Sequence, residues 1–587
     1  MSGKNAMIIQ NCRNPDKALL RVNKKQSWPK RMLGALAGTV VSTVAYASPG
    51  LCADRIAFYY PPFGEFTLSA DDLETFAQTG KITEGFAFYA SRIPKAQLAQ
   101  FRELLRTPFP VNATLASQLT YSPLGESVVK RLAQLIQTET KDSESSFKAL
   151  RASLILAAVN PKGLYVVNVI RRYPSDTIRL NLTEGQEILA NLSQLLRRRD
   201  AIVAFLKQFS DAEIANQPNI DFAQQPDLRL QGNFGWKVRN LPMNDISRRS
   251  RVFQVNLYVP QTKSTNSPKS PFPVIVVSHG VAEDIETFAY VAQHLASYGF
   301  AVAVLEHPGS DAKKYQQFFA GLDTPPSADE LINRPLDVKF VLDQLQQLND
   351  SDTNTDINLT GKLNLQQVGA IGHSYGGYTA LVLGGATIDF QQVRKLCGRN
   401  NSLNLSSFLQ CRAQELYQKI PIPTLTDSRI KAVMALNPLN SIVLGQSGLS
   451  KIQIPVMLMG GTQDIITPAV PEQVIPFTWL QTPVKYLALI ENGTHFSTSE
   501  KLDNSPGVLP VPAALIGPDP ALAQTYVKAF SVAFFQSHLL NQQQYRPFLT
   551  AGYSKYISKP PLNLNLIQSL TPKQLEPFLN QGVGSRE

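Results

Sequence analysis

One short motif in the sequence sets a serine among closely spaced glycines: Gly372, His373, Ser374, Tyr375, Gly376 and Gly377. It follows an apolar run, residues 368–372, that is typical of a buried strand, and it opens a stretch with helical character. A serine at a tight strand-to-helix turn needs neighbours without side chains, because larger residues would collide there. The pattern predicts a nucleophilic Ser374 at a helix N-terminus, where the helix dipole favours developing negative charge.

A serine hydroxyl needs a base to take its proton, and the base needs an acid to orient it. Asp464 follows an apolar run and two glycines at the end of a predicted strand, and His495 lies in a loop after the next predicted strand. The chain order serine, aspartate, histidine is the one used when the serine sits above a parallel sheet. We predict that Ser374, Asp464 and His495 form a catalytic triad that needs no cofactor.

Each of these residues also has a plainer interpretation. Asp464 is suited to cap a helix, and His495 is suited to an incidental place in a loop. Asp311 and Asp337 are rival acids, but both precede the serine, which runs against the expected chain order. The interpretations of Asp464 as acid and His495 as base support each other, because each residue follows its own strand in the expected order.

Two backbone N–H groups are expected to bind the oxyanion that forms on the substrate. One belongs to Tyr375, directly after the serine, and the other to Val281, in a loop after the predicted strand at 273–278. Gly280 permits the sharp turn that this loop needs. Candidates to line the pocket are His279, Gly280 and His307. A satisfied loop or core histidine is the alternative for His279, His307 and His373.

The elements that must position these residues alternate between strand and helix from about residue 236 onward. Continuous apolar runs separated by helical stretches predict a mostly parallel, doubly wound α/β sheet. Residues 54–235 show mostly helical periodicity and no catalytic constellation, so we predict a small, mainly helical domain that packs on the second domain or shapes its active site. The catalytic domain is expected at 236–545, with a lid-like insertion at 385–428 and a C-terminal tail at 546–587.

The insertion contains Cys397 and Cys411, which are close enough in sequence to form a disulfide in an oxidising compartment. Two free buried thiols are the alternative. Residues 505–520 are apolar and rich in proline, and they form either part of a lipid-facing rim or a loop packed on the core. Since no cysteines and histidines have the spacing of metal ligands, we expect no metal.

Length and composition limit the class of protein. With 587 residues, of which 43% are hydrophobic and 17% charged, the chain is expected to form two or more globular domains. The net charge of +11 is concentrated in residues 1–47, which hold eight Lys or Arg and one acid, so we assign no nucleic-acid role. The apolar run at 32–47 ends in Ala-Tyr-Ala, which predicts an export signal and a periplasmic or extracellular protein. An uncleaved N-terminal membrane anchor is the alternative.

The segments VVSHG (276–280), VAVLEH (302–307) and GHSYGG, with the turns that carry Asp464 and His495, resemble the platelet-activating-factor acetylhydrolase branch of the α/β hydrolases. The helical front half joined to such a domain is similar to a two-domain family of photosynthetic bacteria. The resemblance implies the α/β-hydrolase fold over roughly residues 250–540 and hydrolysis of short acyl esters, including phospholipid esters, without a metal. It carries the roles of nucleophile, acid, base and oxyanion donors onto Ser374, Asp464, His495, Val281 and Tyr375.

The sequence leaves three functions open. The first is ester hydrolysis through an acyl-enzyme, with a small-molecule or lipid ester as substrate and peripheral membrane contact as a further expectation. The second is an exported serine peptidase of the same fold, although the front half lacks the repeated short strands of a propeller. The third is a non-catalytic binding protein that keeps the fold, against which the intact triad argues. The sequence does not indicate the oligomeric state, the acyl length or the head group.

Overall fold

The computed structural model describes residues 52–580, except 162, 262–269, 352–358, 398–403, 420, 501–510 and 512. The predicted export signal at 1–47 and part of the proline-rich segment at 505–520 lie outside the described residues. Within the described part of the chain, no helix is both long and apolar enough to cross a membrane.

Contacts divide the chain into two compact units, Met1–Ile188 and Leu189–Glu587. The boundary falls within helix α8 (Leu182–Ala215), whereas the sequence placed the start of the second domain at residue 236. The physical reason is burial: Ile202 and Leu206 of α8 belong to the main core of the second unit. Residues 189–235 of the predicted front domain are therefore part of the other unit.

The first unit combines helices with a small sheet, and the sheet was missed by the sequence analysis. In the described residues of this unit, four short strands pair in the order β2-β1-β4-β3. The strand β1 pairs antiparallel with its neighbour β2 but parallel with β4, which lies far along the chain. Such short strands carry little periodicity, and their pairing depends on distant residues. The strands are β1 (Arg55–Tyr60), β2 (Gly64–Ser69), β3 (Ile136–Gln137) and β4 (Thr177–Leu180).

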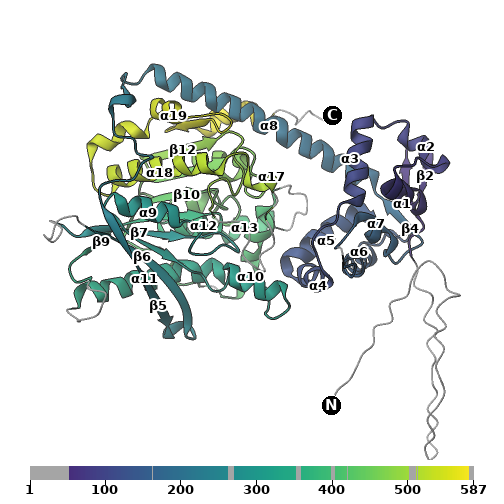
Figure 1. The fold of residues 1–587 in the computed structure, drawn as a ribbon, viewed down its shortest axis with the longest axis horizontal. Helices are drawn as coiled ribbons and strands as arrows, with labels where there is room; N and C mark the ends of the chain where they lie inside the picture. The colour runs from purple at the N-terminus through teal and green to yellow at the C-terminus, as the bar shows by residue number, and fades with distance from the viewer. Residues whose placement is uncertain are drawn as a thin grey trace, which may run out of the picture. The chain divides into compact units, whose positions relative to one another are not determined.

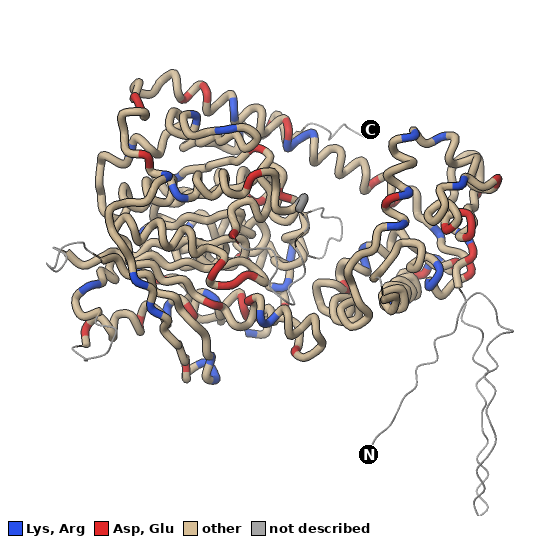
Figure 2. The backbone as a smooth tube through the Cα atoms, viewed as in Figure 1, with Lys and Arg blue, Asp and Glu red and all other residues tan. Residues whose placement is uncertain are grey.

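The helices of the first unit follow the predicted apolar periodicity. Ser69 caps the first of them through its side chain, and Gly80 ends it in the left-handed conformation. Acidic and basic residues are interspersed along the described backbone (Figure 2), and Arg151 joins two helices by pairing with Glu126. The helices are α1 (Ala70–Thr79), α2 (Glu84–Ala90), α3 (Lys95–Arg106), α4 (Ala113–Tyr121), α5 (Pro123–Leu135), α6 (Ser143–Ala157) and α7 (Val166–Arg171).

The second unit is built on one large sheet (Figure 1). Among the described residues, nine strands pair in the order β13-β12-β11-β10-β9-β7-β8-β6-β5. The strands from β12 to β8 in that order are parallel, and the flanking strands are antiparallel. Their bounds are β5 (Gly235–Asp245), β6 (Arg251–Gln261), β7 (Phe272–Ser278), β8 (Ala301–Leu305), β9 (Leu363–His373), β10 (Ile430–Leu436), β11 (Val456–Gly461), β12 (Lys485–Ile490) and β13 (Leu564–Ile567).

Helices cover both faces of this sheet, which confirms the predicted α/β fold. Along β7, Val274 and Val276 belong to one core cluster, and Ile275 and Val277 belong to another. This alternation explains why the strands are continuous apolar runs: each face is buried under its own helices. The first cluster includes α11 (Glu330–Asp350) and α12 (Tyr375–Leu383), and the second includes α9 (Ala289–Ser297) and α18 (Pro520–His538).

The segment 546–587, predicted as a tail, is in part a component of the sheet. Its strand β13 pairs antiparallel with β12 through the register Leu487↔Ile567 to Ile490↔Leu564. Leu564 and Ile567 are 2% exposed, so the apolar side chains of this strand complete the core. A strand of four residues without a long apolar run gives no clear sequence signal, which is why the tail prediction was wrong here.

Among its described residues, the insertion between α12 and β10 contains three short helical segments. A disulfide joins Cys397, directly after the first segment, to Cys411, which begins the third. The buried carboxylate of Glu472 also holds this insertion in place. It accepts hydrogen bonds from Gln410 Nε2 at 2.9 Å and Ser406 Oγ at 2.9 Å. The segments are α13 (Phe390–Leu396), α14 (Ser406–Gln410) and the 3-10 helix η4 (Cys411–Lys419).

Candidate active site

The predicted triad and oxyanion residues all follow carboxyl ends of parallel strands. Ser374 comes directly after β9, Asp464 follows β11, His495 follows β12, and the loop with Val281 follows β7. Strand pairing aligns these ends, since Ser278 lies opposite Gly372 in the β7–β9 register. In open parallel sheets, ligands bind at this edge, so the strand order alone brings the loops together.

The turn that carries Ser374 has the strained geometry of a nucleophile elbow. Ser374 has φ 54° and ψ −114°, a conformation that a residue with a side chain rarely adopts. The surrounding glycines are required by space: a Cβ at Gly372 would lie 1.9 Å from the carbonyl oxygen of Gly376, and one at Gly377 would lie 2.9 Å from Pro438. The strain therefore persists because the packed backbone leaves no alternative.

His495 and Asp464 form a hydrogen-bonded pair. The Nδ1 atom of His495 lies 2.7 Å from Oδ2 of Asp464, and the residues are 2% and 4% exposed. Burial disfavours the charged form of Asp464, but His495 and the hydrogen bonds from Thr467 outweigh it and hold the pKa of the carboxyl below its usual value. An ionised Asp464 accepts the Nδ1 proton of His495 and leaves Nε2 as the basic nitrogen.

Two residues that the sequence analysis did not single out hold the carboxylate of Asp464. Asn437 donates from Nδ2 at 2.6 Å, and Thr467 contributes its backbone N–H at 2.8 Å and its hydroxyl at 2.7 Å. Asn437 directly follows β10, at the same edge of the sheet, and has a positive φ of 44°. A polar residue directly after a buried strand was the available signal for Asn437, whereas Thr467 had none beyond its closeness to Asp464.

In the part of the chain that the structure describes, no hydrogen bond joins the hydroxyl of Ser374 to the imidazole of His495. Catalytic hydrogen bonds are often long before substrate binds and tighten in the complex. The Ser374 backbone is fixed independently, since its N–H donates to the carbonyl of Leu436 at 2.9 Å. The elbow is therefore anchored to β10 whether or not the side chains of Ser374 and His495 are in contact.

The two predicted oxyanion donors are free to bind a ligand. Neither the N–H of Val281 nor that of Tyr375 donates to a protein group within the described residues. The carbonyl of Gly280 accepts from Arg334 Nη2 at 3.0 Å and lies 2.7 Å from Nδ1 of His279. Because the N–H and C=O of a trans peptide point in opposite directions, these contacts direct the Val281 N–H away from Arg334.

Arg334 is a supporting residue that the sequence analysis missed. It is fully buried, donates to the carbonyl of His279 at 2.5 Å, and places its guanidinium 4.6 Å from the ring centroid of Tyr375. It therefore contacts both segments that supply oxyanion donors. Glu330, Arg334 and Asp337 recur at helical spacing on a buried face of α11, and charged residues on an otherwise apolar face were the available signal.

His307 and His279, predicted as candidates to line the pocket, are instead internal. Both are fully buried. The ring of His307 lies between Asp337 Oδ2, 2.9 Å from Nδ1, and Ser278 Oγ, 2.9 Å from Nε2. His279 Nε2 accepts from the backbone N–H of His307 at 3.1 Å. Burial lowers the pKa of both histidines, so they stay neutral. Their hydrogen bonds support the oxyanion loop from the protein interior.

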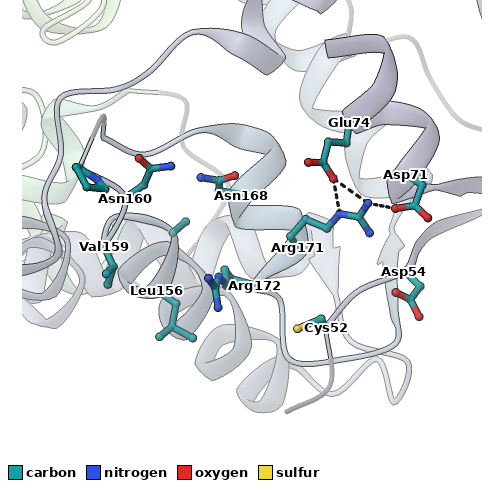
Figure 3. Close-up of a pocket in the computed structure, with 12 residues that line it drawn as sticks. Cys52, Asp54, Asp71, Glu74, Leu156, Val159, Asn160, Asn168, Arg171 and Arg172 are labelled. Carbon is teal, nitrogen blue, oxygen red and sulfur yellow. Dashed lines mark hydrogen bonds and ion pairs between the residues drawn. The ribbon is translucent and has the colours of Figure 1, made fainter. Parts of the chain in front are cut away.

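A separate cavity of about 580 Å³ lies in the first unit (Figure 3). Its polar lining includes Arg171, which pairs with Glu74 and Asp71, as the dashed lines in Figure 3 show. The sequence places all six histidines between residues 279 and 538. The first unit therefore has no imidazole that could serve as a base for a serine nucleophile.

The sheet, its covering helices and the elbow have the architecture of the α/β-hydrolase fold. Residues 52–181 match a family model described as alpha/beta hydrolase of unknown function (DUF1400), and residues 246–333 match one described as platelet-activating factor acetylhydrolase, isoform II. The chain is 27% identical over 177 residues to a platelet-activating factor acetylhydrolase of Cavia porcellus. That alignment covers 26% of this chain and 38% of the relative. The resemblance inferred from the sequence is confirmed.

Proposed function

We propose that this protein is a serine hydrolase that cleaves carboxylic esters, with short-acyl or other lipid esters as the substrate class. The observation that supports this most is the strained elbow of Ser374 at the same sheet edge as the hydrogen-bonded pair His495–Asp464. The partial similarity to an acetylhydrolase supports an ester rather than an amide as the substrate. The predicted signal at 1–47 adds the expectation that the protein is exported.

In the proposed reaction, His495 Nε2 takes the proton of the Ser374 hydroxyl while the oxygen bonds to the ester carbonyl carbon. The carbonyl electrons move onto oxygen, and the N–H groups of Val281 and Tyr375 bind the resulting oxyanion. When the tetrahedral intermediate collapses, the imidazolium of His495 returns the proton to the departing alkoxide, and an acyl-enzyme remains. Water, deprotonated by the same imidazole, then releases the acid and restores Ser374.

Asp464 has the role of fixing the imidazole in this proposal. Its carboxylate oxygens are held by Asn437 and Thr467, so it cannot rotate away from His495 without breaking several hydrogen bonds. A buried carboxylate so held stabilises the imidazolium that forms when Ser374 attacks. No metal or cofactor takes part in any step.

The test is hydrolysis of p-nitrophenyl acetate and butyrate by the purified full chain, with the matching p-nitroanilide amides in parallel. We expect ester cleavage to exceed amide cleavage, and Ser374→Ala to lower kcat by about 10⁴-fold or more. The control is Ser127→Ala, an exposed serine in the first unit, which should retain wild-type kcat. A fluorophosphonate should label the wild type and the control but not Ser374→Ala.

Amide cleavage at rates that match the esters would favour the serine peptidase. A folded wild type that neither cleaves esters nor accepts the fluorophosphonate would favour the non-catalytic binding protein. Either result would overturn the proposed ester hydrolase. Varying the acyl chain and testing phospholipids with short acyl groups would then define the substrate within the ester class.

A further inference from the structure

Glu283 and His373 form a buried acid–base pair next to the candidate site. His373 immediately precedes Ser374, and Glu283 belongs to the loop after β7 that also holds Val281. The Nδ1 atom of His373 lies 3.0 Å from Oε1 of Glu283, and the side chains are 1% and 3% exposed. The proposed ester hydrolysis uses neither residue, so this pair needs an explanation of its own.

The hydrogen-bond partners of His373 define its protonation state. Its Nδ1 faces the carboxylate of Glu283, and its Nε2 lies 2.9 Å from the backbone carbonyl oxygen of His495. Both partners accept hydrogen bonds and have no proton to donate. Both ring nitrogens must therefore carry protons, which makes His373 a buried imidazolium whose charge is balanced by Glu283.

The same carboxylate contacts two further segments of the site. Glu283 accepts from the backbone N–H of Gly280 at 2.5 Å and from Ser499 Oγ at 3.1 Å. A Cβ at Gly280 would lie 2.7 Å from Glu283 Oε2 and 3.0 Å from His373 Nδ1, so the oxyanion loop packs directly on the pair. The pair consequently touches the oxyanion loop, the elbow and the loop that carries His495.

We propose that the ion pair between Glu283 and His373 is a positioning device that fixes the oxyanion loop and the His495 loop relative to Ser374. Through Nε2, His373 holds the backbone of His495 while Asp464 holds its ring. Through its carboxylate, Glu283 holds Gly280, one residue before the proposed oxyanion donor. This inference rests on the proposed function, because it assigns a role in the geometry of that same site.

The charged groups around the pair indicate how the device depends on pH. His373 faces Glu283, the charge of Asp464 and the ring of His495, whose centroid is 4.8 Å away, and Glu283 also faces His279. Burial disfavours the imidazolium, but Glu283 outweighs it, so the pKa of His373 lies above its usual value and that of Glu283 below. Without the carboxylate, burial would be opposed only by the carbonyl of His495 and the charge of Asp464, and His373 would lose its proton at a lower pH.

The experiment compares Glu283→Gln with wild type in ester hydrolysis from about pH 6 to pH 9. We expect kcat to fall about 10- to 100-fold with little change in KM, since small misplacements of catalytic groups have effects of this size. The alkaline limb of kcat should move to lower pH, and Glu283→Asp should restore part of the activity. The control Glu286→Gln makes the same chemical change in the same loop and should keep the wild-type profile.

A second measurement does not depend on activity or on the folding of Glu283→Gln. Nitrogen-15 NMR of histidine-labelled wild type, with His373→Gln to assign the signal, should show both ring nitrogens of His373 protonated at pH 8. A neutral His373, or a folded Glu283→Gln with wild-type kcat and pH profile, would overturn the positioning role. If the wild type cleaves no ester, the proposed function fails while the NMR result still decides the charge state of the pair.

Discussion

The backbone of Gly376 lies against the carbonyl oxygen of Ser278: a Cβ at residue 376 would be 1.9 Å from that oxygen. Gly376 is in the first turn of α12, and Ser278 ends β7. The nucleophile helix and the strand that leads to the oxyanion loop thus meet with no space for a side chain. This contact fixes how far Tyr375 and Val281 lie from each other, and with them the two proposed oxyanion donors.

The first prediction follows from that contact. Gly376→Ala should lower the free energy of unfolding by about 3 kcal/mol, because the added methyl group forces two backbone segments apart. Urea unfolding of the full chain measures the loss. The esterase kcat should fall as well, since the oxyanion donors separate.

The matched control for this substitution is Gly235→Ala, in which the nearest atom to the new Cβ is the Cβ of Gln261 at 3.9 Å. Its stability should stay within about 0.5 kcal/mol of wild type. If Gly376→Ala were as stable as this control, the close approach between α12 and β7 would be wrong.

The second prediction concerns the orientation of His495. Asp464→Asn replaces the carboxylate that accepts the Nδ1 proton, so the imidazole is no longer held in the tautomer with a basic Nε2. We expect kcat to fall about 10⁴-fold with the fold retained. Circular dichroism and steady-state kinetics together check this. Asp227→Asn, at a side chain that pairs with Arg229, is the control, and an Asp464→Asn variant with more than a tenth of wild-type kcat would contradict the role.

The third prediction uses Asp311, which caps α10 (Ala312–Phe319) and is 3% exposed. Burial raises its pKa from 3.8 to about 6. The unfolded chain therefore releases this proton first, and wild-type stability falls as the pH rises from about 4 to about 6. Asp311→Asn keeps a good N-cap without the buried charge, so it should gain about 1 to 3 kcal/mol at pH 7.5.

The gain from Asp311→Asn should disappear near pH 3, where the wild-type carboxyl is neutral in the folded and largely neutral in the unfolded state. Denaturant unfolding at several pH values measures this trend. The control is Asp323→Asn, because Lys314 lowers the pKa of that carboxyl and the change should bring no gain at neutral pH. A pH-independent effect of Asp311→Asn would contradict the buried-charge explanation.

The fourth prediction concerns Glu472, whose fully buried carboxylate also accepts from Ser441 Oγ at 2.5 Å and from the N–H of Asn440 at 2.8 Å. Glu472→Gln turns an amide donor toward groups that themselves donate. We expect a loss of about 2 to 4 kcal/mol in the free energy of unfolding and faster proteolysis of the insertion that contains Gln410. The exposed Glu415→Gln in that insertion should show neither change.

The chemistry-bearing loops could be predicted because each carries a local signal. A few neighbouring positions are enough to recognise the glycines around Ser374. The same is true of Asp464 and His495, which are polar residues that follow apolar strands. The supporting residues Arg334, Glu283 and Thr467 were missed, since what they do depends on partners from other strands and helices. The four-stranded sheet of the first unit and strand β13 were missed for the same reason, because a short strand is defined mainly by its distant partner.

The sequence by itself determined the fold class, the identity of the candidate triad and its order along the chain, because hydrophobic periodicity and glycine spacing are local properties. Only the tertiary structure decided which histidines are internal, that 189–235 and β13 belong to the second unit, and that Cys397 pairs with Cys411. These outcomes depend on which surfaces pack against each other and so exclude water. Burial is a property of the packed molecule rather than of any one segment.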